Sequence, residues 1–177
     1  MRKLILLAAA PLALAAGPAM AQSATGTVTI DGTVGSRCLF TTDNAHISLN
    51  EISQGGSTTD AGRLDPARVN GQSATLVGWC NNAAAQMTVE AFPLLNTAGA
   101  ASGFTNRVDF TATADANSTQ GEDTTLTGGA GTAVSVGMFT GNIDVTLSDA
   151  SAPGNNLLVA GDYDGSVKVT LAPVVAP

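Results

Sequence analysis

One alternating stretch decides the fold: Gly-Thr-Val-Thr-Ile-Asp-Gly-Thr-Val-Gly-Ser-Arg-Cys, residues 26–38. Its apolar residues Val28, Ile30 and Val34 share one face, with Gly32 in the same row and polar residues between them. A period of two is the pattern of an extended strand that buries one face. Glycine is unusual in such a row because it offers no side chain to pack. The stretch is therefore a strand whose apolar row contains one gap.

The residues before this strand have the pattern of a signal peptide. A basic start precedes an apolar run at residues 4–16, and an Ala-Met-Ala cleavage site follows at residues 19–21. The apolar run is too short for a helix that spans a membrane. We therefore predict a signal peptide over residues 1–21, a mature chain that begins at Gln22, and no membrane span in the mature chain.

Length and charge limit the classes of partner. Removing 21 of the 177 residues leaves 156, which is enough for one domain with a hydrophobic core. The full chain has 7 basic and 14 acidic residues, and the signal peptide takes two of the basic ones, so the mature charge is 5 − 14 = −9. The remaining basic residues are scattered, so we expect no binding of nucleic acid or anionic lipid.

The chain has two cysteines, Cys38 and Cys80, and both lie in the exported part. In an oxidising compartment such a pair is most simply one disulfide. Closing a loop of about 42 residues would stabilise the fold by about 4 kcal/mol on the loop-entropy model. A metal site is the alternative, but it would need more ligands than His46 can add.

Further alternating stretches follow along the chain, and none has the 3.6-residue period of a helix. We expect polar loops at residues 54–70 and 115–131, and Trp79 packed over the disulfide in the core. The pattern predicts an all-β, immunoglobulin-like antiparallel sandwich, and strand count alone leaves a closed barrel possible. The expected strands are residues 46–52, 73–80, 86–92, 104–114 and 161–171, with a hairpin formed by 134–139 and 143–147.

Candidate catalytic residues are few. His46 lies in a strand pattern with no nucleophile motif near it. The acidic pair Asp162 and Asp164 has the alternate carboxylates of a calcium loop but lacks the later bidentate glutamate. We therefore expect no enzyme activity, no cofactor and no metal.

Taken together, the mature chain resembles the pilin subunits of chaperone–usher fimbriae. The resemblance rests on the signal peptide, the glycine-bearing strand, Cys38 soon after it, and Cys80 at the end of an apolar stretch. Major pilins are the first choice within this group, and spore-coat-U-like subunits of archaic systems are the second. The last matching feature is the alternating C-terminal strand with Val167, Val169 and Leu171.

The resemblance implies an immunoglobulin-like sandwich that lacks one strand and is completed by a donated strand. A donor-strand extension would cover residues 22–35, and the sandwich domain would cover residues 36–177. The implied partners are identical or related pilin subunits, a periplasmic chaperone and an outer-membrane usher. The chain would pass through the periplasm into a surface fimbrium that supports cell adhesion. The donor residues would be Val28, Ile30, Gly32 and Val34, and the C-terminal strand edge would carry Val167, Val169 and Leu171.

Two other interpretations remain open. The segment at residues 26–34 could be the first strand of a complete sandwich, because alternation alone does not distinguish the two cases. The chain would then be an autonomous secreted β-sandwich that binds a glycan or surface ligand through its loops. A secreted hydrolase ranks last, because no catalytic pair can be assembled.

Overall fold

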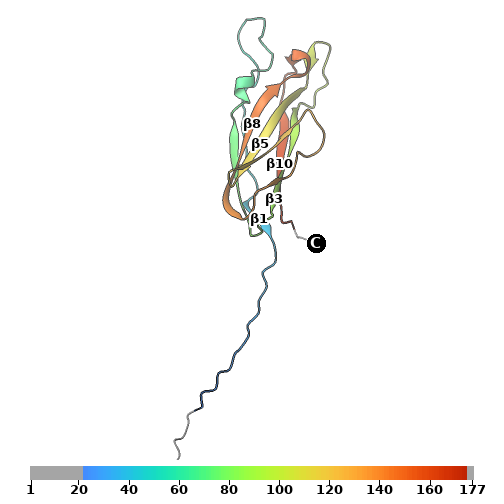
Figure 1. Cartoon of the computed structure of the whole chain (residues 1–177). Helices are drawn as coiled ribbons and strands as arrows, with labels where there is room; N and C mark the ends of the chain where they lie inside the picture. Colours follow the sequence, from blue (N-terminus) through green and yellow to red (C-terminus); the bar gives the residue numbers. More distant parts are fainter. Residues whose placement is uncertain (1–21, 175–177) are drawn as a thin grey trace, which may run out of the picture. The chain divides into compact units, whose positions relative to one another are not determined.

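The computed structural model describes residues 22–174, so the predicted signal peptide lies outside the described residues. The chain divides into two units between Thr33 and Val34. In the first unit, residues 22–33 contain no helix or strand. The second unit is the folded domain (Figure 1).

The domain is built almost entirely of β-strands, which confirms the predicted fold class. Two short 3₁₀-helices, η1 and η2, are the helical elements of the described residues. The elements are β1 (Cys38–Thr42), η1 (Pro66–Arg68), β2 (Ser73–Cys80), β3 (Gln86–Leu95), β4 (Phe104–Thr105), β5 (Arg107–Ala116), β6 (Thr119–Thr124), β7 (Val134–Ser135), β8 (Phe139–Ser151), η2 (Pro153–Asn155), β9 (Leu157–Leu158) and β10 (Asp164–Ala172).

The main strands follow the order β1-β2-β8-β5-β3-β10, and every pair along this path is antiparallel. The link between β5 and β3 is limited to two register positions, Leu94 with Val108 and Leu95 with Arg107. Beyond that corner, β5 pairs with β8 and β6, while β3 pairs with β10 and β7. The result is two layers joined at one corner, as in a sandwich.

The core lies between these two layers. Along most of β3, β5 and β8 the buried residues recur at every second position, because successive side chains of a strand point to opposite faces. The second layer contributes four side chains of β3, including Leu94, and the first layer contributes side chains of β5 and β8. The buried residues of these three strands include Met87, Val89, Ala91, Ala112, Ala114, Ala116, Ile143, Val145 and Leu147.

Tyr163 precedes β10 and connects the start of that strand to β4 and to the residue that follows β9. Its hydroxyl is shared between the backbone carbonyls of Val159, at 3.0 Å, and Thr105, at 3.1 Å. Burial raises the pKa of this phenol above its ordinary value, and the hydrogen bond to Val159 opposes the shift.

The expected loop at residues 115–131 is wrong, because β5 and β6 form a hairpin there. The strand β6 is polar in sequence, but Asp123 is 7% exposed and accepts a hydrogen bond of 2.8 Å from the backbone N–H of Ala91. A carboxylate that satisfies a backbone donor of the facing strand can occupy a core position. Polar composition therefore concealed a buried strand.

Two further expectations are also wrong. The expected hairpin of residues 134–139 and 143–147 is absent, because its turn residues 140–142, Gly141 among them, lie within the continuous strand β8. Trp79 pairs in register with Leu39 on the face opposite Cys80, so it lies outside the core. Adjacent residues of a strand point to opposite faces, so a buried Cys80 places its neighbour on the outer surface.

Candidate strand-accepting groove

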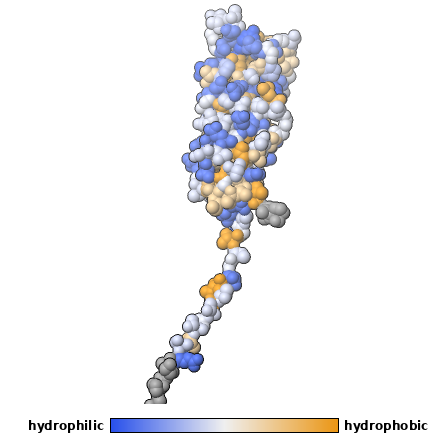
Figure 2. Space-filling view, in the orientation of Figure 1, coloured by the Kyte–Doolittle hydropathy of each residue, from blue (hydrophilic) through white to orange (hydrophobic). Residues whose placement is uncertain are grey.

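The predicted donor residues are fully accessible. The exposed fractions are 85% for Val28, 90% for Ile30 and 89% for Val34, and Gly32 has no atom within 4 Å of an added Cβ. Figure 2 shows separate hydrophobic patches spaced along this segment. Three large apolar side chains on an extended segment without strand pairing are costly to leave in water, and such surfaces usually mark interaction sites.

The predicted disulfide between Cys38 and Cys80 is confirmed. The two cysteines are direct register partners on β1 and β2, with their Cα atoms 4.1 Å apart. Cys80 is 3% exposed and belongs to the core. The disulfide therefore holds the first strand of the domain immediately after the alternating segment.

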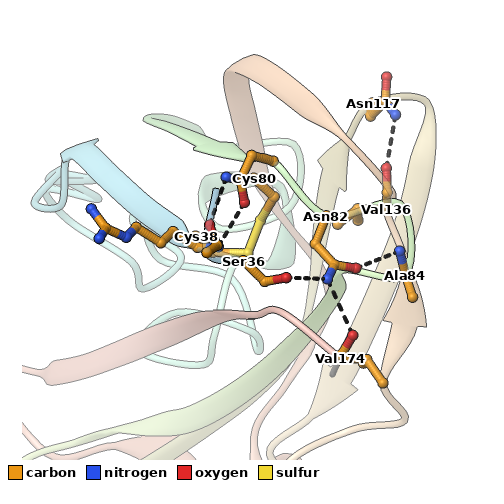
Figure 3. The surroundings of a disulfide bond; sticks show 11 residues. Ser36, Cys38, Cys80, Asn82, Ala84, Asn117, Val136 and Val174 are labelled. Atoms are coloured by element: carbon orange, nitrogen blue, oxygen red, sulfur yellow. Dashed lines mark hydrogen bonds between the residues drawn. A yellow bond between two sulfur atoms is a disulfide. The ribbon is translucent and has the colours of Figure 1, made fainter. Parts of the chain in front are cut away.

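Two asparagines hold the chain just before Cys38. The side-chain carbonyl of Asn81 accepts from the N–H of Arg37 at 2.6 Å, and its amide donates to the carbonyl of Gly35 at 3.0 Å. The amide of Asn82 donates to the hydroxyl of Ser36 at 2.8 Å and to the carbonyl of Val174 at 3.2 Å (Figure 3). These hydrogen bonds fix the backbone of residues 35–37, which belong to no strand. This root of the extension therefore lies beside the end of the last strand.

The last strand, β10, is an edge strand of the described residues. It pairs with β3 from Asp164 to Ala172, and no strand of residues 22–174 pairs with its other edge. The predicted edge residues Val167, Val169 and Leu171 lie on β10, are half-buried, and pack against the core. Unpaired backbone groups along such an edge are a template for pairing with another strand.

The expected strand at residues 46–52 is wrong, although its side chains alternate as a strand would. Ile47 and Leu49 are half-buried and pack against the core, while His46, Ser48 and Asn50 are exposed. No strand or bridge is assigned to residues 43–50, and none of the backbone hydrogen bonds found in the described part involves them. This segment has the side-chain pattern of a strand but not the backbone partner.

A groove of about 1230 Å³ runs between this segment and β10. Residues 43–53 line one side, and residues 158–169 line the other. The floor is apolar and comes from four strands, namely β2, β3, β5 and β8. The floor residues are Ala74, Leu76, Leu94, Phe110, Val145 and Leu147. A hydrophobic floor between two edges without strand partners has the features of a site for one more strand.

Four exposed carboxylates line the groove. Asp162 and Asp164 lie on one side, and Asp43 and Glu51 lie on the other. The hydroxyl and N–H of Ser53 donate to the Glu51 carboxylate at 2.7 and 2.8 Å, and these hydrogen bonds lower its pKa. Glu51 is therefore charged at neutral pH.

Features of other kinds of site are sparse. Within residues 22–174, no three His, Cys, Asp or Glu side chains gather as metal ligands would. In the same part of the chain, no helix combines the length and apolar character needed to cross a membrane. His46 is exposed on the segment that borders the groove, with no hydrogen-bond partner for its ring in the described residues.

Comparisons with family models, with curated proteins and with solved structures found no match for this chain. Fold and groove therefore define only a general class. The chain is a disulfide-bonded, antiparallel all-β sandwich with an open apolar groove beside an unpaired edge strand.

Proposed function

We propose that this chain is an exported structural subunit that polymerises by strand exchange. The alternating segment of one copy enters the groove of the next copy and becomes the strand between β10 and residues 43–50. The observation that carries the proposal is the coexistence, in one chain, of an exposed apolar row and an apolar groove without a strand in it. The resemblance to chaperone–usher pilins points in the same direction.

The backbone chemistry supports this assignment. An added strand gains main-chain hydrogen bonds from the edge of β10 and places alternate side chains on the groove floor. Residues 43–50 already have inward-facing apolar side chains, so they gain a backbone partner without changing their packing. The row from Val28 to Val34 spans about 20 Å at 3.3 Å per residue, which is comparable with the length of β10.

The same groove is a hazard before assembly. An open edge beside an apolar floor invites aggregation, so a subunit of this kind needs temporary cover. We propose that a periplasmic chaperone provides it and that an outer-membrane usher releases the subunit into a surface fimbrium that supports adhesion. The disulfide is consistent with folding in an oxidising compartment.

The mobility of the mature chain in a denaturing gel tests the proposal. Without heating, assembled chains should form a ladder in sodium dodecyl sulfate, and boiling should collapse it to monomer. Deletion of residues 22–34 should remove the ladder and leave a folded domain whose groove stays open to the chaperone. If the deleted chain still forms the ladder, or if the mature chain never does, strand exchange through this segment is wrong.

The competing function, an autonomous sandwich that binds a glycan or surface ligand, predicts a different result. Such a protein would remain monomeric with its groove closed by its own first segment. Of its two expected binding loops, the one at residues 115–131 is largely a β-hairpin, which reduces the loop surface available.

A further inference from the structure

The charge at the root of the extension, on Arg37, has no ion-pair partner among residues 22–174. The other four basic side chains of residues 22–174 each form an ion pair, with distances between 2.6 and 3.8 Å. Arg37 forms none in this part of the chain and is exposed. Asn81 nevertheless holds its backbone on both sides, because it accepts from the N–H of Arg37 and donates its own N–H to the carbonyl of Arg37 at 3.0 Å. The arginine is fixed in position, and its guanidinium is available to another molecule.

Of the two ends of the groove, one carries two neighbouring carboxylates. At one end Ala172 pairs with Gln86, near the root of the chain's own extension, where Asn82 bonds to Val174. At the other end Asp164 pairs with Leu95. Asp162 and Asp164 line the groove at that second end, are exposed, and have no ion pair among the described residues. Asp43 also lines the groove, directly after β1, so the end at Asp162 and Asp164 is distinguished by two neighbouring carboxylates.

The spacing of the two sequences brings the opposite charges together. In an antiparallel pairing, residue numbers of the two strands change in opposite directions. If Val28 lies opposite Leu171, then Ile30 lies opposite Val169 and Val34 opposite Gly165. Arg37 is three residues further on, about 10 Å, and reaches the level of Asp162.

We propose that Arg37 pairs with Asp162 and Asp164 of the copy that receives the extension. This inference rests on the proposed function and adds the direction and register of insertion to it. A parallel insertion would place Arg37 at the Ala172 end instead, away from Asp162 and Asp164. Antiparallel insertion also places the donor's domain at the end of the acceptor remote from the acceptor's own extension. That contact is heterologous, so each added copy leaves a new extension and the chain of copies stays open.

Opposite charges at this contact also counter a general repulsion. Each mature copy carries the expected charge of −9, so approach of two copies is unfavourable except where a cation faces acids. Attraction of this kind acts mainly on the association rate and on orientation, and salt weakens it.

Strand-exchange rates of charge variants test the inference. The mature chain, released from a purified chaperone complex, is followed by the growth of the unheated gel ladder at low salt. We expect Arg37→Glu and the double variant Asp162→Lys/Asp164→Lys each to slow assembly by roughly three- to tenfold. Combining all three substitutions in one chain should restore most of the rate, because every copy then carries both reversed partners.

Controls separate this contact from general charge and folding effects. Glu122→Lys changes the charge by the same amount per site at an exposed position of β6, outside the groove lining, and should slow assembly far less. Circular dichroism melting should be the same for Arg37→Glu and the unmodified domain. If Arg37→Glu reduces the yield of folded chain, Arg37→Gln replaces it, and the unmodified chain should itself lose rate between low salt and about 0.5 M salt.

Failure of the inference is distinguishable from failure of the proposed function. If the unmodified chain forms no ladder, strand exchange itself is wrong. If it forms a ladder that Arg37→Glu leaves at the same rate, or if the combined variant is no faster than its parents, the Arg37 contact is wrong while strand exchange stands.

Discussion

Replacing Ile30 by alanine distinguishes a donor strand that enters another copy from an ordinary first strand of the chain's own domain. The side chain is 90% exposed in the chain by itself, so truncation removes no contact from the folded domain. Stability of the isolated domain should therefore change by less than about 0.5 kcal/mol, as for most exposed positions. In the polymer the same side chain would lie on the groove floor, so its truncation should destabilise the junction between two subunits.

The size of that effect follows from burial. Moving an exposed isoleucine into an apolar site contributes roughly 1.5–3 kcal/mol, and core isoleucine-to-alanine changes cost about 2–5 kcal/mol. We expect a loss of about 2–3 kcal/mol per subunit junction for Ile30→Ala. At 1.4 kcal/mol per factor of ten, dissociation of a junction should become roughly 30- to 150-fold faster.

Two measurements on the same variant check this prediction. Urea denaturation of the chain kept monomeric gives the domain stability, and the time course of ladder loss at fixed temperature gives the junction stability. Thr29→Ala is the matched control, because Thr29 is also exposed but lies on the opposite face of the strand. The reasoning fails if Ile30→Ala destabilises the monomer by more than 1 kcal/mol, or if its junctions dissociate at the rate of the control.

Three other substitutions have defined outcomes. Gly32→Leu should leave the domain stability unchanged, because no atom lies within 4 Å of the added Cβ, yet it should block ladder formation where the groove floor lies close to the donor backbone. Tyr163→Phe should cost about 1 kcal/mol in urea denaturation at pH 7, since one buried hydroxyl hydrogen bond is lost. Because burial raises the phenol pKa above its ordinary 10.0, the tyrosine contribution is complete below pH 10 and declines above it, and the phenylalanine variant should lack that decline. Replacing Cys38 and Cys80 by serine should lower the free energy of unfolding by about 4 kcal/mol, the loop-entropy value for a sequence separation of 42 residues, and an unchanged urea midpoint would contradict it.

Alternation in the sequence predicted the strands that bury one face. Residues 73–80 form β2 with the expected bounds, and the stretches at 86–92 and 161–171 correspond to β3 and β10. Apolar side chains at every second position restrict the pairing register of a strand. A shift of the register by one residue would turn the whole apolar row from the core to the solvent. The disulfide was predicted from the two cysteines of a chain expected to be exported, and the register of β1 and β2 brings Cys38 and Cys80 together.

Composition was a poorer guide than alternation. The strand β6 contains Gly121, Glu122 and Asp123, and its polar character suggested a loop. Its inward positions are filled by a glycine and by a hydrogen-bonded carboxylate, which a hydropathy pattern counts as exposed. Gly141 likewise suggested a turn, although β8 continues through it with a φ of 146°.

The groove could not be predicted from the residues that line it. Its rims are residues 43–53 and residues 158–169, which are distant in sequence, and its floor combines four strands. Sequence reasoning found the alternation of residues 46–52 and inferred a strand, but pairing requires a neighbour. In the described part of the chain no neighbour is present, so a strand-like row remains without backbone hydrogen bonds. The proposed donor strand explains this mismatch.

Hydrogen–deuterium exchange of monomer and polymer tests strand insertion most directly. The amides of residues 26–34, of residues 43–50 and of the free edge of β10 have no backbone partner in the described monomer. If one copy's strand fills the next copy's groove, all three segments should become protected together in the polymer, by roughly a hundredfold or more in exchange rate. Polymers in which residues 43–50 and β10 exchange as fast as in the monomer would contradict the account.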